Sequence, residues 1–325
     1  MAERGDAARS NKIKLLAVVG PTASGKSGLA VALAKACNGE IVSCDSMQVY
    51  RRMNVGTAKP TFDEMEGIRH HLIDIAEPDE PFSVAAYVER AADAIAEICS
   101  RGNLPILCGG TGLYLDALLR GGLEETTSDP RLREALFAYA ETHGAHALHE
   151  RLAAVDPESA AATHENNVKR VVRALEIYES TGVTKTEMDR RSRERKSPYD
   201  AVVIGLRYAE REVLYARIDR RVEQMFAAGL LAETERLLVE GVFEKNTTAA
   251  QAIGYKELLS FLSGNGSLQD AVEALKLATR HYAKRQMTWF GAKDYVSWID
   301  MTEDGRTKDF EAVVAEALRI WRDRT

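Results

Sequence analysis

GPTASGKS, residues 20–27, fits the pattern G-x-x-x-x-G-K-[ST] and lies between a predicted strand and a predicted helix, so it indicates the class of fold. Residues 14–20 (KLLAVVG) form a short apolar run that ends in glycine. Residues 24–36 (SGKSGLAVALAKA) have helical apolar spacing, which stops at Asn38. Backbone amides of such a loop bind a phosphate group at the N-terminus of the helix. Lys26 adds a positive charge, and its neighbour Ser27 can hold Mg²⁺.

Strands and helices continue to alternate after this loop, which is typical of a parallel sheet. A helix is predicted from just after Ser83 to near Gly102. Ligands bind at the carboxyl ends of parallel strands, where Gly20, Asp45 and Gly109 are all expected to lie. The buried-strand candidates are residues 40–45 (EIVSCD), 72–75 (LIDI) and 104–108 (LPILC).

A helical insertion is predicted in the middle of the chain. Strand signals vanish over residues 129–195, and Asp-Pro pairs at 129–130 and 156–157 each place a capping Asp before a proline at the first helical position. A strand candidate returns at residues 201–207 (AVVIGLR), and a long helix opens at Ser267. We therefore predict an α/β protein with a parallel sheet core at residues 13–124 and 201–325, interrupted by a helical domain at residues 125–200.

The composition of the 325 residues, 45% apolar and 28% charged, is that of an ordinary globular protein. A formal net charge of −6 argues against a protein that coats nucleic acid non-specifically, although residues 190–196 (RRSRERK) and 280–285 (RHYAKR) concentrate positive charge. Residues 1–12 lack the apolar run of a signal peptide, and no apolar run is long enough to span a bilayer. We expect a cytoplasmic monomer that has no membrane partner.

Two polar residues near the predicted loop could carry chemistry. Asp45 follows the second strand, where its carboxylate could bind Mg²⁺ through water or accept a proton from a nucleophile within about 3 Å. Thr111 lies in GGTGLY (109–114), whose glycines would let the backbone approach a ligand. The phosphate compound stays open, because ATP, GTP and prenyl pyrophosphates all present a diphosphate. A small-molecule kinase, in which Asp45 activates a substrate hydroxyl, is therefore one interpretation.

Six separated motifs narrow the choice: GPTASGKS (20–27), CDSMQVYRRMNVGTAKP (44–60), GGTGLY (109–114), KRVVRALEIYESTG (169–182), QAIGYKEL (251–258) and TRHYAKRQMTWF (279–290). Together they closely resemble the tRNA dimethylallyltransferase family, also called the tRNA isopentenyltransferase family. The resemblance covers essentially residues 14–289. No Cys/His pattern for the zinc finger of eukaryotic relatives follows Trp289, so the similarity is to the bacterial form.

The resemblance implies a P-loop NTPase-like core and a prenyl transfer reaction. The dimethylallyl group would move from dimethylallyl pyrophosphate to the N6 amine of the adenosine immediately 3′ of the anticodon, in tRNAs that read codons starting with U. Lys26, Asp45 and Thr111 would be the catalytic residues, with Mg²⁺ as cofactor and Ser27 as its protein ligand. The donor is expected to bind Gly20, Pro21, Thr22, Ala23, Ser24, Gly25, Lys26, Ser27 and Arg280.

The same resemblance implies that the anticodon loop of a tRNA is the partner. A closer alternative, an adenylate isopentenyltransferase, would need neither the helical insertion nor the basic helix. An RNA-binding protein with a vestigial P-loop is disfavoured by the intact Lys26, Ser27 and Asp45. The residues expected to contact tRNA are Asp45, Ser46, Met47, Gln48, Thr111, Arg133, Lys169, Arg170, Val171, Val172, Arg173, Gln251, Gly254, Tyr255, Lys256, Lys284, Arg285 and Gln286.

Overall fold

The computed structural model describes residues 12–122, 129–303 and 305–324. The chain forms two compact units: unit 1 comprises Met1–Leu119 and Pro198–Thr325, and unit 2 comprises Arg120–Ser197. The predicted domain boundary at residues 124–125 lies outside the described residues. Over the described ranges, no helix has the length and apolar character needed to cross a membrane.

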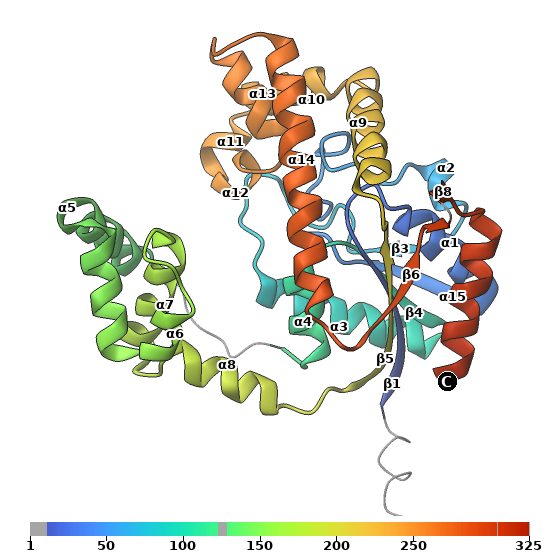
Figure 1. Ribbon diagram of the computed structural model, residues 1–325, viewed down its shortest axis with the longest axis horizontal. Helices are drawn as coiled ribbons and strands as arrows, with labels where there is room; N and C mark the ends of the chain where they lie inside the picture. Colours follow the sequence, from blue (N-terminus) through green and yellow to red (C-terminus); the bar gives the residue numbers. More distant parts are fainter. Residues whose placement is uncertain (1–11, 123–128, 304, 325) are drawn as a thin grey trace, which may run out of the picture. The chain divides into compact units, whose positions relative to one another are not determined.

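Unit 1 is built on a six-stranded sheet in which every pair of neighbouring strands is parallel (Figure 1). The parallel sheet predicted from the alternating pattern is thereby confirmed. In spatial order the strands are β3 (His70–His71), β2 (Gly39–Ser43), β4 (Leu104–Cys108), β1 (Ile13–Val19), β5 (Tyr199–Arg207) and β6 (Val296–Asp300).

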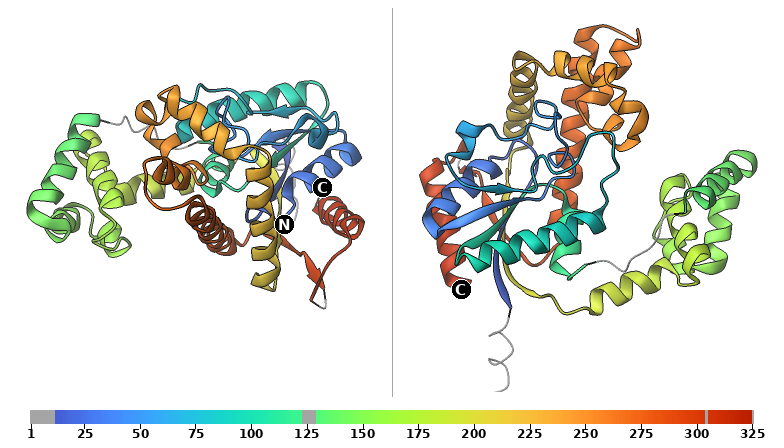
Figure 2. Two further views of the ribbon diagram at one scale, coloured as in Figure 1. Left: turned by 90° about the horizontal axis from the view of Figure 1, so that it is seen from above. Right: turned by 180° about the vertical axis from the view of Figure 1, so that it is seen from behind.

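Helices cover both faces of this sheet, as Figures 1 and 2 show. Helices α1 (Lys26–Cys37) and α15 (Phe310–Arg324) pack on one face, and α3 (Val84–Ser100) and α4 (Gly112–Leu119) pack on the other. In β1, Leu16 and Val18 join the first cluster, whereas Leu15, Ala17 and Val19 join the second. Burial on both sides is why β1 is a continuous apolar run rather than an alternating one.

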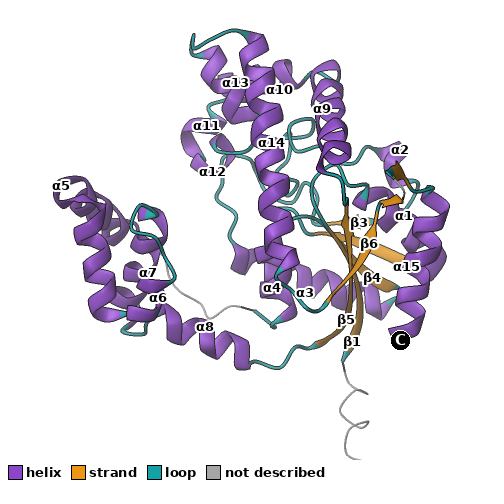
Figure 3. Ribbon diagram, viewed as in Figure 1, coloured by secondary structure: helices purple, strands orange, loops and turns teal. Residues whose placement is uncertain are grey.

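A third apolar cluster joins a group of helices to the segment that follows β2. Figure 3 shows these helices as neighbours. Tyr50 and Met53 of that segment are fully buried against Leu237, Tyr255 and Leu275. This packing places helices beside the loops at the carboxyl ends of β1 and β2. The helices of the group are α9 (Arg211–Ala227), α10 (Leu230–Val239), α11 (Val242–Lys245), α12 (Thr247–Ala250), α13 (Tyr255–Leu262) and α14 (Leu268–Gly291).

Small elements complete unit 1, and one predicted strand is wrong. Helix α2 is Phe62–Met65, and β7 (Thr302–Glu303) pairs with β8 (Arg306–Thr307) as an antiparallel ribbon. The strand expected at residues 72–75 does not form, because Leu72 and Asp74 have φ angles of 62° and 56°. Those angles break an extended chain. The preceding His70 and His71 pair with β2 instead.

Unit 2 is entirely helical over its described residues, with α5 (Pro130–Val155), α6 (Pro157–Ala161), α7 (Val168–Thr181) and α8 (Lys185–Glu194). Both predicted capping residues are confirmed: the carboxylate of Asp129 accepts from the amides of Arg131 and Leu132, and that of Asp156 accepts from Ser159 N. The insertion was predicted to end at residue 200; unit 2 ends at Ser197, and β5 begins at Tyr199.

The core of unit 2 corrects part of the predicted tRNA surface. Val171 and Val172 are 0% and 1% exposed and pack among the leucines of α5, so their side chains cannot contact RNA in this fold. Arg133 and Arg173 lie on the rim of this core. Their guanidinium groups are 2.8 Å and 2.7 Å from Oε2 of the fully buried Glu176. Both arginines therefore neutralise a buried carboxylate inside unit 2.

A second buried carboxylate fixes the β2–β3–β4 edge of unit 1. Glu40 accepts hydrogen bonds from Arg101 Nε at 2.9 Å, Arg101 Nη2 at 2.8 Å and Asn103 Nδ2 at 2.7 Å, and His71 Nε2 is 2.7 Å from its Oε2. Hydrogen bonds from Arg101 outweigh the opposing effect of burial and hold the pKa of Glu40 at about 2. The charged carboxylate is therefore a stabilising feature of this edge.

We expect Glu40→Gln to lower the free energy of unfolding by about 1–3 kcal/mol at neutral pH, because an amide replaces the charged acceptor of these bonds. The pKa of Glu40 is depressed from 4.5 to about 2, so its contribution is complete above pH 4.5 and is lost as pH falls toward 2. Urea unfolding at several pH values should show the difference from the wild type narrowing over that interval. Glu97→Gln is the control, because Glu97 pairs with the same Arg101 at the surface. A difference that stays constant down to pH 2 would contradict the assignment.

Candidate active site

The phosphate-binding loop, residues 20–27, connects β1 to α1 as the motif predicted. Gly20 has a φ of 140°, and a Cβ there would meet the carbonyl oxygen of Leu206 at 2.6 Å, so only glycine lets β1 and β5 run this close. Gly25 precedes α1 without a side-chain cap, which leaves the first amides of the helix available to an anion. Lys26 Nζ donates a hydrogen bond to the carbonyl of Pro21 at 2.6 Å.

The electrostatics of the loop favour an anionic ligand. Burial lowers the pKa of Lys26 to about 8, and the neighbouring Arg221 lowers it further, whereas Cys108 and Asp45 oppose the shift. Burial likewise lowers the pKa of Arg221. Burial thus disfavours the charged form of both cations, and the carboxylate of Asp45 offsets this effect only in part. A diphosphate would supply further negative charge.

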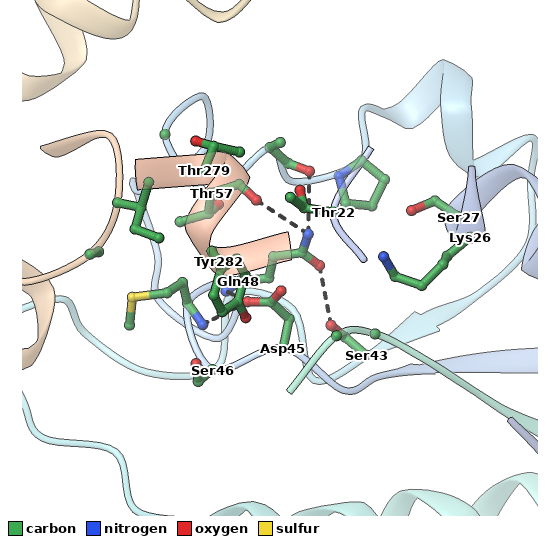
Figure 4. Close-up of a pocket in the computed structure, with 18 of the residues that line it drawn as sticks. Thr22, Lys26, Ser27, Ser43, Asp45, Ser46, Gln48, Thr57, Thr279 and Tyr282 are labelled. Atoms are coloured by element: carbon green, nitrogen blue, oxygen red, sulfur yellow. Dashed lines mark hydrogen bonds between the residues drawn. The ribbon is translucent and has the colours of Figure 1, made fainter. Parts of the chain in front are cut away.

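A cavity of about 330 Å³ opens beside the loop, and Figure 4 shows the side chains that line it. Lys26 and Ser27 project into it from α1, whereas Asp45 and Gln48 enter from the segment after β2 (Figure 4). The loop at the carboxyl end of β4 adds its backbone. The prediction that these strand ends share one site is confirmed. The rest of the lining mixes polar side chains with apolar ones, and the apolar residues include Met47, Val222, Met225, Ile253 and Leu275.

Asp45 has one oxygen fixed and one available. Its Oδ1 accepts from the backbone amides of Met47 at 2.8 Å and Gln48 at 3.2 Å, which is the local turn that Asp commonly forms. Among the described residues, no hydrogen bond reaches Oδ2. Thr111 does not itself line the cavity: its Oγ1 accepts from Ser46 N at 3.1 Å and so ties the GGTGLY loop to the Asp45 turn.

Gln286 joins two of the loops that border the first cavity. It is 5% exposed, its Oε1 accepts from Thr22 N at 2.8 Å, and its Nε2 donates to the carbonyl of Gly110 at 3.0 Å. A Cβ on Gly110 would lie 1.9 Å from that nitrogen, so the glycine makes room for the amide. The side chain therefore holds two loops together, and it also lines the first cavity.

Arg280, predicted to bind the donor, lies outside the lining of this cavity. Its guanidinium pairs with Asp219, with Nε 3.2 Å from Oδ1, and lies 5.5 Å from the ring centre of Tyr215. Helix α9 supplies the cations near the loop instead. Arg217 Nε donates to the carbonyl of Ala23 at 2.9 Å, and Arg221 lines the cavity.

These arginines were missed because charged residues on a helix are usually ordinary surface. A second cavity, of about 690 Å³, also borders the loop and shares Lys26, Ser27 and Arg221 with the first. Arg217, Arg220 and Lys59 also line it. The available signal was the spacing of four between Arg217 and Arg221, which places both on one helix face.

The remaining residues predicted to contact tRNA fall into three groups. Ser46, Met47, Gln48, Gln251 and Arg285 line the first cavity. Lys169 and Arg170 on α7, Lys256 on α13 and Lys284 on α14 are exposed. Gly254 and Tyr255 are buried, and the Tyr255 hydroxyl donates to Glu233 Oε1 at 2.7 Å, so that side chain serves the core rather than RNA.

Comparison with known proteins now adds to this geometry. A family model described as IPP transferase matches residues 48–293. A tRNA dimethylallyltransferase of Halalkalibacterium halodurans is 49% identical over 306 residues, which cover 94% of this chain and 95% of that protein. A tRNA dimethylallyltransferase of Bacillus subtilis is 48% identical, covering 90% of this chain and 92% of the relative.

Solved structures agree with these relatives. The crystal structure of the full-length tRNA isopentenylpyrophosphate transferase from Bacillus halodurans matches with a TM-score of 0.72 at 46% identity, covering 96% of this chain and 97% of the other. Crystallographic snapshots of a eukaryotic dimethylallyltransferase acting on tRNA match with a TM-score of 0.80 at 30% identity, covering 96% and 80% of the two chains. This chain belongs to the IPP transferase family.

Proposed function

We propose that this protein transfers the dimethylallyl group of dimethylallyl pyrophosphate to the N6 amine of the adenosine immediately 3′ of the anticodon in tRNA. Its relatives carry the name tRNA dimethylallyltransferase, and one structural neighbour was captured acting on tRNA. The observation that carries the proposal is that Lys26 and Asp45 open into one cavity that also has an apolar surface, to which Met225 and Leu275 contribute. None of these names describes a small-molecule kinase or an adenylate isopentenyltransferase.

The donor is proposed to bind with its diphosphate at the loop and its five-carbon group against the apolar wall. Lys26, Arg221 and the first amides of α1 provide positive charge for the diphosphate. Met225 and Leu275 line the same cavity and offer the apolar surface that the prenyl group needs. Dimethylallyl pyrophosphate has both characters in one molecule.

The proposed reaction is a displacement at the primary allylic carbon of the donor. The N6 amine of adenine forms a bond to this carbon, the carbon–oxygen bond to pyrophosphate breaks, and N6 loses one proton. The available Oδ2 of Asp45 would accept that proton, while Lys26 and the loop amides stabilise the charge gathering on the pyrophosphate. The adenine must leave the stacked anticodon loop to reach the cavity.

Magnesium is proposed as a cofactor bound through the donor. Within the described ranges, no group of three or more His, Cys, Asp or Glu side chains could hold a metal ion by itself. Mg²⁺ commonly keeps several waters and binds through substrate phosphates together with one or two protein oxygens, and the Ser27 hydroxyl at the cavity fits that role. When bound, the ion would offset charge on the leaving pyrophosphate.

Incubation of the purified protein with labelled dimethylallyl pyrophosphate, Mg²⁺ and unmodified tRNA should give label in the tRNA and N6-isopentenyladenosine on nuclease digestion. A tRNA with guanosine in place of the target adenosine is the control, because guanosine has no N6 amine. Labelled ATP with the same components tests the kinase. Label that stays with the donor, or that passes from ATP to a small molecule, would contradict the proposed function.

A further inference from the structure

Glu233 is a buried carboxylate that lies outside both cavities, and both of its oxygens accept hydrogen bonds. It stands on α10 and is 6% exposed. Its Oε2 accepts from the backbone amides of Asn54 and Val55, each at 3.0 Å. Its Oε1 accepts from Gly56 N at 2.9 Å and from the Tyr255 hydroxyl at 2.7 Å. One side chain thus binds three consecutive amides of a loop, and bonds to an ionised acceptor are the stronger kind.

The loop that Glu233 binds is part of the cavity wall. Gly56, Thr57 and Ala58 line the cavity that contains Lys26 and Asp45. The ring of Tyr255 packs directly on Gly56, where an added Cβ would lie 2.3 Å from the ring. The hydrogen bonds to Glu233 and the packed ring of Tyr255 therefore both restrict the position of this loop.

From this loop, a chain of hydrogen bonds leads to Asp45. Gln48 Nε2 donates to the carbonyls of Thr57 at 3.4 Å and Ala58 at 3.2 Å (Figure 4). Its Oε1 accepts from the Ser43 hydroxyl at 3.2 Å. The backbone amide of the same Gln48 donates to Asp45 Oδ1 at 3.2 Å. Displacing the loop would move Gln48, and Gln48 is one of the two donors that fix the Asp45 carboxylate.

We propose that Glu233 is a positioning residue for prenyl transfer: it anchors residues 54–58 so that Gln48 holds the Asp45 carboxylate toward the attacking amine. The inference rests on the proposed function, because the effect is read in that reaction. A carboxylate is required because all four groups around it donate. A glutamine would turn an NH₂ group toward at least one amide N–H, which cannot accept it.

The first measurement compares Glu233→Gln with Glu40→Gln as a matched control. Both replace a buried, multiply bonded carboxylate of unit 1, but among the described residues the partners of Glu40 are His71, Arg101 and Asn103, none of which lines either cavity. We expect E233Q to lower kcat about 10- to 100-fold, the size of effect that a displaced reacting group produces. Pyrophosphate affinity should stay within about twofold of the wild type, because the phosphate-binding loop is untouched. E40Q should keep kcat despite its lower stability.

A double-mutant cycle with Gln48→Ala separates positioning from general destabilisation. If Glu233 acts through Gln48, E233Q should change kcat by less than about twofold once Gln48 is alanine. Full additivity of the two effects would overturn the inference, as would an unchanged kcat in E233Q. An equal loss of kcat in E40Q would also overturn it, since the effect would then be one of stability alone.

A second variant tests the inference if E233Q does not fold. Should E233Q lose cooperative thermal unfolding, Tyr255→Phe replaces it in the cycle, because this change deletes one of the four bonds and keeps the ring on Gly56. The same non-additivity with Gln48→Ala is expected, and additivity overturns the inference.

If the wild type transfers no prenyl group to tRNA, the proposed function fails, and the inference about Glu233 fails with it. If the wild type is active and the cycle is additive, only the role of Glu233 fails.

Discussion

Asp45→Asn is expected to lower the rate of prenyl transfer by about 10²- to 10⁴-fold, the range attributed to a positioned general base. The change is nearly isosteric. An asparagine Oδ1 can still accept from the amides of Met47 and Gln48, so the turn that holds the side chain should survive. What is lost is the ability of the second oxygen to take a proton from N6. The measurement is single-turnover transfer of labelled prenyl group to tRNA at saturating donor.

A lower rate in D45N identifies Asp45 as the base only if the variant still binds its substrates. We expect D45N to bind tRNA and pyrophosphate with affinities close to those of the wild type, because the phosphate-binding loop and the exposed cations are unchanged. Asp63→Asn is the matched control, since Asp63 is an exposed carboxylate on α2 and should leave the rate unaffected. Near-normal turnover of D45N would refute Asp45 as the base. A loss of tRNA affinity as large as the loss of rate would make it a binding residue instead.

The fold was predictable where the local pattern and the tertiary environment agree. The strands β1 and β4 are buried on both faces, and their sequences are correspondingly continuous apolar runs. At the start of α14, Ser267 and Asp270 form the reciprocal hydrogen bonds of a capping box. The edge strand β6 was missed because VSWID is short and mixes polar with apolar residues. It becomes a strand by pairing with β5, which a local pattern does not show. The LIDI run was misjudged because its apolar pattern does not reveal the left-handed φ angles of Leu72 and Asp74.

The site divides in the same way. Lys26, Asp45 and Gln48 were found because each stands in a motif directly after a strand, where parallel sheets bring loops together. Arg221 and Glu233 were not found, because a charged residue on a helix looks like solvated surface until the fold buries it. The position of a residue within a family motif also led to wrong predictions of its role. Val171, Val172 and Tyr255 were assigned to RNA, although their side chains are buried in the core.

Lys26→Met is expected to lower kcat/KM for the donor by about 10²- to 10³-fold, equivalent to the roughly 2.7–4 kcal/mol lost when one preorganised donor to a developing charge is removed. Methionine keeps much of the length and apolar stem of lysine, so α1 and its packing should be retained. The charge that stabilises the departing pyrophosphate is removed. Circular dichroism and thermal unfolding establish that the variant is folded, and unchanged kcat/KM would reject Lys26 as a donor-binding residue.

The pH dependence of pyrophosphate binding gives this prediction a second, independent readout. Burial holds the pKa of Lys26 at about 8 in the free protein, and a bound anion favours the charged form and so raises that pKa. Below pH 8 the lysine is already protonated, and it adds no pH dependence. Above pH 8 it must gain a proton as the ligand binds, so affinity falls by up to about tenfold per pH unit. The titration of pyrophosphate itself is common to both proteins, so the ratio of wild-type to K26M affinity should be flat below pH 8 and decline above it. A ratio that stays constant across pH 7–10 would mean that the diphosphate does not meet the Lys26 ammonium.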